Sequence, residues 1–233
     1  MARKVKEEDY AGKRKEILDV AQRLVYTKGF DQMSIQDILD ELHISKGAFY
    51  HYFASKGDLL EALIDRMRLD VEPIILPIVD DPALPTFDKL HRFFDTTARW
   101  KTAHKTYVLS ILKVWYTDDN ALVREKATAN TIKQIAPLLA RVIRQGMQEG
   151  TLTTPFPEQA AEIVLVILTN LGTAFKDLFF SAEAPAEKMR RARGVVAAHN
   201  DAMERVLGAP TGSLNLVDAD TLNEWFVADD DRS

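Results

Sequence analysis

The spacing of apolar residues constrains this chain more than any other feature. Leu, Ile, Val and Ala recur at steps of three and four residues along nearly the whole length, and alternating runs of the strand type are few. A period of three to four residues is typical of a helix that buries one face. The sequence therefore predicts an all-α protein.

Helix-starting and helix-ending residues divide this pattern into short helices followed by longer ones. Ser or Pro stands at several expected starts, and Gly follows several expected ends. After a helix at about 56–69, four prolines predict a loop: Pro73, Pro77, Pro82 and Pro85. The remaining helices are expected at about 13–28, 34–42, 45–53, 86–103, 105–116, 120–148, 157–180 and 185–207.

Composition excludes several classes of protein. The 233 residues are 46% hydrophobic and include no cysteine, so a large core is possible while disulfides and thiolate sites are not. The first 16 residues are charged and contain no apolar segment of the signal-peptide type. The most apolar stretch, 160–180, carries Glu162 and Lys176, which predicts a buried helix and no membrane span. We expect a cytoplasmic protein.

Charge is distributed unevenly along the chain. The net charge is −5, which argues against bulk electrostatic binding of nucleic acid. Residues 1–56 carry ten Lys or Arg and nine Asp or Glu, so the remainder carries 30 − 10 = 20 against 35 − 9 = 26. The N-terminal quarter is therefore nearly neutral and the rest is acidic.

Two capping patterns enclose a short turn in this N-terminal quarter. "SIQD" at 34–37 predicts a capping box, in which Ser34 and Asp37 each bond the other's backbone amide. About three residues after Leu42, Ser45 is placed to cap a second short helix, which contains "KGAFYHYF". Two short helices joined by such a turn form the helix-turn-helix pattern, whose second helix directs its N-terminus toward DNA.

The segment "KRKEILDVAQRLVYTKGFDQMSIQDILDELHISKGAFYHYFASKGDLLEALI" (13–64) resembles the DNA-binding domain of the TetR family of transcriptional regulators. The resemblance rests on the Ile-Leu-x-x-Ala core, the Gly-Phe after the first helix, and the aromatic helix followed by Phe-x-Ser-Lys. It implies an all-α homodimer that binds a palindromic operator and leaves DNA when a small molecule fills a C-terminal pocket. His43 departs from the family, which has Gly in the turn, where φ is positive; His tolerates this geometry at a cost of about 1 kcal/mol.

The aromatic helix presents two faces. Phe49 and Phe53 lie four residues apart on one face, which we assign to the core. Tyr50 and Tyr52 flank that face and are expected to reach phosphates, as the family uses these positions. His51 is equally compatible with a phosphate contact and with no contact. The complete set expected at DNA is Ser34, Gln36, Ser45, Lys46, Gly47, Ala48, Tyr50, His51, Tyr52 and Lys56.

Beyond residue 70 only the aromatic residues indicate a ligand site. The resemblance places them on pocket-lining helices, although such a stripe is more often plain core. A pocket of this kind favours a hydrophobic or aromatic effector. The candidate ligand-binding residues are Phe93, Thr97, Trp100, His104, Tyr107, Ile111, Trp115, Asn170 and Phe175.

The sequence offers no chemistry of the catalytic kind. His91 and Asp95 lie four residues apart, but no third ligand stands at a suitable spacing, so no metal site is expected. Neither a Gly-rich phosphate loop nor a nucleophile constellation is present, so we expect no enzyme and no cofactor.

We expect three parts in the chain. Residues 1–56 form the DNA-binding domain, with the helix-turn-helix at about 34–53. Residues 57–208 form the helical effector-binding and dimerisation domain, which dimerises through helices at about 157–180 and 185–207. Residues 209–233 form a partly disordered tail. Two alternatives stay open: a regulator of the same fold without an effector, and a small helical binding protein or enzyme.

Overall fold

The computed structural model describes residues 2–226 and the side chains from Glu8 onward. This part of the chain forms ten α-helices, one short 3-10 helix and no strand, so the all-α prediction is confirmed. The predicted disorder of the last residues falls on 227–233, which lie outside the described residues. Within the described range, no helix is both long and apolar enough to span a membrane.

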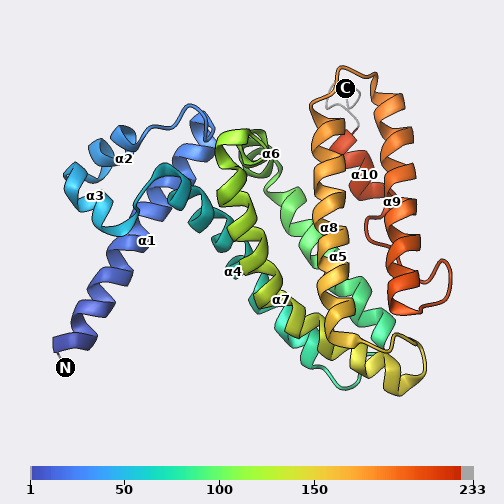
Figure 1. Ribbon diagram of the computed structural model, residues 1–233. Helices are drawn as coiled ribbons and strands as arrows, with labels where there is room; N and C mark the ends of the chain where they lie inside the picture. The colour runs from blue at the N-terminus through green and yellow to red at the C-terminus, as the bar shows by residue number, and fades with distance from the viewer. Residues whose placement is uncertain (1, 227–233) are drawn as a thin grey trace. The chain divides into compact units, whose positions relative to one another are not determined.

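The described chain divides into two compact units, and each helix is placed in one of them or continues from one into the other (Figure 1). Unit 1 contains the residues up to Arg68 together with Thr106–Ala127. Unit 2 contains Leu69–Lys105 and the residues from Thr128 onward. The helices α4 (Lys56–Asp80) and α7 (Ala121–Glu149) each contribute to both units.

Unit 1 is built around α1 (Ala2–Lys28), against which α2 (Ile35–Leu42) and α3 (Lys46–Tyr52) pack (Figure 1). The unit also includes α6 (Lys105–Trp115) except its first residue, and the 3-10 helix η1 (Asp118–Asn120). Each helix turns an apolar face inward, as the three- and four-residue spacing predicts. Fully buried side chains in this core include Ile17, Ala21, Ile38, Phe49, Leu60 and Leu63.

Unit 2 contains the long pair α8 (Pro157–Phe179) and α9 (Pro185–Leu207), which lie side by side in opposite directions (Figure 1). The unit also contains α5 (Thr86–Ala103), the short α10 (Ala219–Phe226) and the later parts of α4 and α7, and α10 packs on both α5 and α9. This docked helix lies in the segment from residue 209 onward that the sequence analysis assigned to a partly disordered tail.

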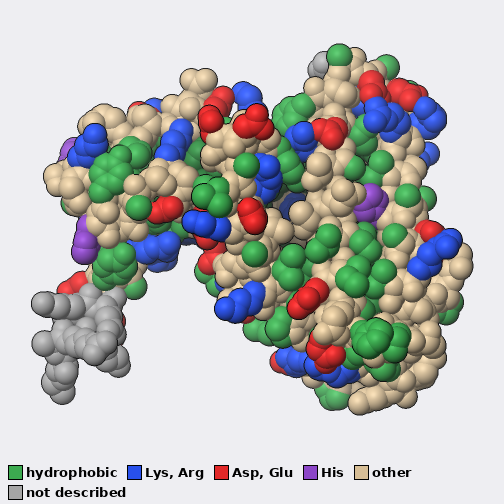
Figure 2. Space-filling model, viewed as in Figure 1, with side chains coloured by type: hydrophobic (Ala, Val, Ile, Leu, Met, Phe, Trp, Pro, Cys, Tyr) green, Lys and Arg blue, Asp and Glu red, His purple; other side chains and the backbone are tan. Residues whose placement is uncertain are grey.

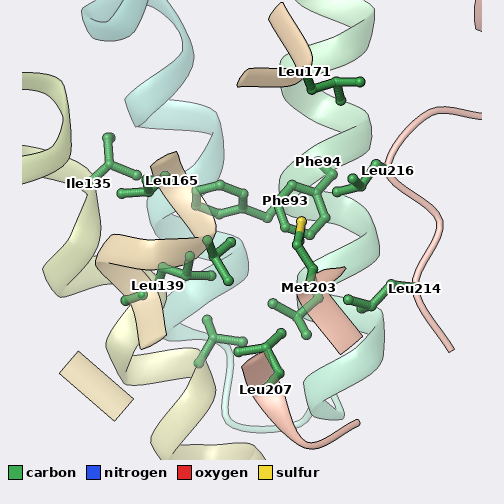
Figure 3. Packing of buried hydrophobic residues seen from close by; sticks show 14 of the residues in the cluster. Phe93, Phe94, Ile135, Leu139, Leu165, Leu171, Met203, Leu207, Leu214 and Leu216 are labelled. Atoms are coloured by element: carbon green, nitrogen blue, oxygen red, sulfur yellow. The ribbon is translucent and has the colours of Figure 1, made fainter. Parts of the chain in front are cut away.

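The core of unit 2 joins residues far apart in the sequence (Figure 3). Phe93 and Phe94 of α5 meet in a T-shaped arrangement with ring centroids 5.6 Å apart. Leu214 and Leu216, from the segment between α9 and α10, are buried in the same cluster. The buried carboxylate of Glu204 accepts the amides of Gly212 and Leu214 at 3.0 and 2.9 Å, which fixes this segment against α9.

The loop predicted to begin at Pro73 was wrong, because α4 continues through Pro73 and Pro77. An internal proline costs a helix about 3 kcal/mol, since it loses one hydrogen bond and crowds the carbonyl four residues earlier. Here both prolines are exposed, while Val71, Ile75 and Val79, at four-residue steps, are all buried. Burial of one such side chain contributes about 1.5–3 kcal/mol, so the burial of all three is of the same size as the cost of the two prolines and can offset it.

The first helix also begins earlier than predicted, near Ala2 instead of Lys13. Its charged side chains form pairs at helical spacing, with Lys13 and Lys15 bonded to Glu16 and Asp19. Pairs of this kind support a solvent-exposed helix that has little apolar surface of its own.

Candidate nucleic-acid interface

The start of α2 is held by the predicted capping box. The Ser34 hydroxyl accepts the Asp37 amide at 3.1 Å, and the Asp37 carboxylate accepts the Ser34 amide at 2.8 Å. Lys28 donates to the same carboxylate at 2.6 Å. These bonds, that from Lys28 first, lower the pKa of Asp37 from its usual 3.8 to about 2. The capping box is confirmed, and it fixes the start of α2 directly after Ser34.

The turn between α2 and α3 has the left-handed residue that the sequence implied. His43 has φ 51° and ψ 41°, and its amide donates to the Leu39 carbonyl. The next amide, of Ile44, donates to the same carbonyl at 3.1 Å. Both bonds occupy a carbonyl that the end of α2 would otherwise leave unpaired. The turn therefore forms with histidine in place of glycine.

The helix α3 is anchored by its apolar face. Its N-cap residue, Ser45, accepts the Ala48 amide at 3.1 Å. Phe49 and Phe53 are 0% and 2% exposed, and their ring centroids lie 5.8 Å apart. Both phenylalanines are therefore core residues, as predicted.

The opposite face of α3 is open to solvent. Lys46 and Gly47 are exposed and Tyr50 is 42% exposed, whereas Ala48 is half-buried. The Lys46 ammonium lies 5.9 Å from the centre of the Tyr50 ring, one helical turn away. A Cβ on Gly47 would meet only the Ser45 hydroxyl, at 3.9 Å. The chain's own packing thus does not require glycine at position 47.

The other residues predicted to contact DNA differ in exposure and in whether their side chains already have a partner within the protein. Ser34 and Gln36 are exposed, but the Gln36 amide already donates to Asp40 at 2.6 Å. Lys56 is half-buried, and its ammonium lies 4.7 Å from the centre of the Phe30 ring. Burial lowers the pKa of Lys56. The ammonium of this first residue of α4 is thus held over the Phe30 ring.

At the C-terminal end of α3 the chain adds a residue that the sequence interpretation missed. His51 is exposed and Tyr52 is half-buried, and the Tyr10 ring contacts both. The signal was available, because Tyr10 lies four residues before Arg14 and seven before Ile17, in register with the buried face of α1. Because the sequence analysis began this helix at Lys13, it did not place Tyr10 on the helix.

The candidate ligand residues fall in both units. In unit 1, Tyr107 and Ile111 are buried and Trp115 is half-buried. The Tyr107 ring stacks on Tyr26 with centroids 4.9 Å apart. These three residues belong to the same unit as α1, α2 and α3.

In unit 2, Phe93 is core and the Thr97 hydroxyl donates to its carbonyl. Trp100 and His104 stack with centroids 4.2 Å apart. Asn170 bonds His199 at 3.1 Å, and the Phe175 ring meets Phe226 at 5.4 Å. One pocket that gathers all nine residues remains a prediction.

His91 and Asp95, which the sequence analysis rejected as metal ligands, are engaged elsewhere. The His91 imidazole bonds the Ser213 carbonyl at 2.9 Å, and Asp95 accepts from Arg99 at 2.9 Å. Within the described residues, no group of three or more His, Asp or Glu side chains is placed to hold a metal ion.

Comparison with known proteins agrees with this geometry. The family model "Bacterial regulatory proteins, tetR family" matches residues 17–63, the segment that contains α2, α3 and their supports. The chain belongs to the TetR family. The family match thus covers the part of the chain in which α3 presents one buried and one exposed face.

Relatives of this TetR-family chain are named as regulators. The HTH-type transcriptional regulator TtgR of Pseudomonas putida is 24% identical over 179 residues, which cover 73% of this chain and 83% of that protein. An HTH-type transcriptional regulator from the lacX 3′ region of Lactococcus lactis is 46% identical over 52 residues. That match covers 22% of this chain and only 26% of the Lactococcus protein, so it is confined to a small part of both.

Solved structures share the fold of this TetR-family chain. A TetR-family transcriptional regulator from Pectobacterium atrosepticum superimposes with a TM-score of 0.64 at 18% identity. The match covers 87% of this chain and 98% of that one, so it extends well beyond the helix-turn-helix. The likeness confirms an N-terminal helix-turn-helix followed by a helical C-terminal part.

Proposed function

We propose that this TetR-family chain is a transcriptional repressor that binds a palindromic operator as a dimer. The observation that carries the proposal is the division of α3 into a buried face and an open face. Phe49 and Phe53 hold the helix, while Lys46, Gly47 and Tyr50 stand free at its exposed side. A rigidly held helix with free donors at its N-terminal end suits the major groove of DNA.

The proposed contacts divide into positioning and reading contacts. Tyr50, Tyr52 and Lys56 would donate to phosphates, and Ser34 and Gln36 would do so at the start of α2. Lys46 would reach a guanine edge or a phosphate, and Ala48 a thymine methyl group. Direct reading of bases by so few side chains is sparse, so the shape of the DNA would contribute to specificity.

A dimer is supported by the outer face of α8 and α9. Ile163 and Val166 are 47% and 55% exposed, and Ala197 and Ala198 on the neighbouring helix are exposed as well. Figure 2 shows hydrophobic side chains spread over this face, with charged side chains gathered where α8 ends and α9 begins. Small residues beside exposed aliphatic ones allow two helix pairs to approach closely and form a four-helix interface.

The effector we propose is a small hydrophobic or aromatic molecule bound in the helical C-terminal part. Its support is the family resemblance and the half-buried aromatic residues of unit 2, such as Trp100 and Phe175. An effector that binds the DNA-incompetent state more tightly would shift the population away from DNA. Such a repressor acts in the cytoplasm, and it needs neither catalysis nor a cofactor.

A second candidate is a regulator of the same fold without an effector. The observation that favours it is the contact of Phe226 with Phe175, since Phe226 covers a ring that a ligand would otherwise meet. The two candidates predict different responses of the melting temperature to added ligands. A hydrophobic ligand library should raise the melting temperature and release DNA for an effector-responsive repressor, and should do neither for the second candidate.

Selection of binding sequences from random duplex DNA with the full chain tests the proposed function, followed by gel shift on the selected sequence and on the gene's own upstream region. The proposal expects a palindromic site and binding that weakens steeply with salt. Binding without sequence preference, or no binding, would exclude it.

A further inference from the structure

The part of α1 around Tyr10 and Arg14 lies beside the C-terminal end of α3. Arg14 places its guanidinium 4.8 Å from the centre of the Phe53 ring, the residue that ends α3. Tyr10 precedes Arg14 by four residues, one helical turn, and therefore lies on the same face of α1. Through this face, α1 therefore contacts the C-terminal end of α3 as well as the buried core.

Three rings meet at this point. The Tyr10 ring lies 4.8 Å from that of Tyr52, tilted by 37°, and 5.5 Å from that of His51 at 84°. The His51 and Tyr52 rings are themselves 5.1 Å apart at 78°. Tilted and T-shaped pairs at these distances are favourable beyond the area that they bury. Tyr10 therefore contacts both neighbours at the C-terminal end of α3.

The Tyr10 hydroxyl adds a polar contact to the same end. It donates a long hydrogen bond of 3.5 Å to the His51 carbonyl. That carbonyl is among the last four of α3, which the helix itself cannot pair. Because α3 has only seven residues, its order depends on contacts with other helices. Tyr10 supplies such contacts where Phe49, one turn earlier, no longer reaches.

We propose that Tyr10 is a positioning residue for DNA recognition, which acts through Tyr52 and does not itself contact DNA. The tilted Tyr10 ring restricts the Tyr52 side chain to one orientation and holds the last turn of α3, so that Tyr52 meets its phosphate without further loss of freedom. Binding groups fixed in advance cost less entropy on association. The role in DNA binding rests on the proposed function, while the ordering of α3 by Tyr10 stands without it.

A double-mutant cycle on the full chain tests whether Tyr10 acts on DNA binding through Tyr52. Affinity for the selected duplex would be measured for the wild type, Tyr10→Ala, Tyr52→Ala and the double variant. Tyr10→Ala should weaken binding about fivefold, the value of one aromatic pair, and should weaken it no further in the Tyr52→Ala background. Tyr10→Phe, which keeps the ring, should stay within about twofold of the wild type. Ala11→Ser, at the next exposed position of α1, is the matched control.

Amide hydrogen exchange of the free protein tests, without DNA, whether Tyr10 orders the last turn of α3. The Phe53 amide bonds the Phe49 carbonyl at 3.1 Å and reports the last turn of α3. Tyr10→Ala should speed its exchange about fivefold and leave the Ile44 amide in the preceding turn unchanged.

Three results would overturn the inference. One is wild-type affinity in Tyr10→Ala, and another is an equal loss in both backgrounds, which would make Tyr10 a DNA contact in its own right. The third is unchanged exchange at Phe53. If the wild-type chain selects no sequence at all, the proposed function fails, and the exchange measurement still decides whether Tyr10 orders α3.

Discussion

The backbone amide of Phe30 donates a hydrogen bond of 3.0 Å to the hydroxyl of Ser110, which lies 80 residues further along the chain. This bond joins the turn after α1 to α6 within unit 1. Lys113, one turn further along α6, also pairs with Asp31 at 3.0 Å. The helix α6 is therefore fixed to the turn after α1 through Ser110 and Lys113, which lie one helical turn apart.

Ser110→Ala should lower the free energy of unfolding of the chain by about 1–2 kcal/mol, because the partly buried Phe30 amide loses its acceptor. Urea unfolding of the wild type and the variant checks this value. Lys113→Ala is the matched control, and its exposed ion pair should contribute less than about 1 kcal/mol. Equal stability of Ser110→Ala and the wild type would mean that water replaces the hydroxyl at no cost.

His43→Gly should raise the free energy of unfolding by about 1 kcal/mol, since glycine adopts the left-handed conformation of this turn without steric cost. Operator affinity should stay at the wild-type value, because the backbone and not the imidazole defines the turn. Thermal unfolding and DNA titration of the same preparation measure both quantities. A loss of affinity of more than threefold would instead identify His43 as a phosphate contact.

The acid side of the stability curve should depend on Asp37. Its folded pKa of about 2 lies below the usual 3.8, chiefly because Lys28 donates to the carboxylate. The ionised group therefore stabilises the fold fully above pH 3.8, and this contribution disappears as the pH falls toward 2. Urea unfolding at pH 6, 4, 3 and 2 should show the gap between the wild type and Asp37→Asn closing over that range.

Lys28→Met provides the control for the Asp37 effect. Because Lys28 is the largest cause of the lowered pKa, this variant should make most of the same pH dependence disappear. A gap between wild type and Asp37→Asn that stays constant from pH 6 to pH 2 would contradict the assignment.

Val166→Glu should dissociate the proposed dimer. A carboxylate on the outer face of α8 would be buried unpaired in a four-helix interface, so we expect the dimer dissociation constant to rise at least about tenfold. Light scattering after size exclusion measures this change. Leu122→Glu, at an apolar position of α7 that is 61% exposed, is the matched control and should stay dimeric. A dimeric Val166→Glu would place the interface elsewhere.

Much of unit 1 could be predicted from sequence because its signals are local. A capping box acts over four residues, and the opposite faces of Phe49 and Tyr50 follow from helical spacing alone. The continuation of α4 through Pro73 and Pro77 could not be predicted in this way. It depends on how well Val71, Ile75 and Val79 are buried by helices distant in the sequence, which no local pattern contains.

The two candidate sites differ for a similar reason. The residues expected at DNA lie within one short segment, so their relative placement follows from two helices and a turn. The residues expected at a ligand come from several long helices, and the structure distributes them between two units. The contact of Phe226 with Phe175 spans about 50 residues of sequence and has no signal in either segment.

The most direct test of DNA recognition by α3 is the salt dependence of operator affinity for Lys46→Ala beside Lys133→Ala, an exposed lysine of α7 in unit 2. We predict that Lys46→Ala weakens binding about tenfold and lowers the slope of log affinity against log salt by about one, the signature of one lost phosphate contact. Lys133→Ala should change neither quantity. Wild-type affinity and slope in Lys46→Ala would contradict the assignment of α3 as the helix that reads DNA.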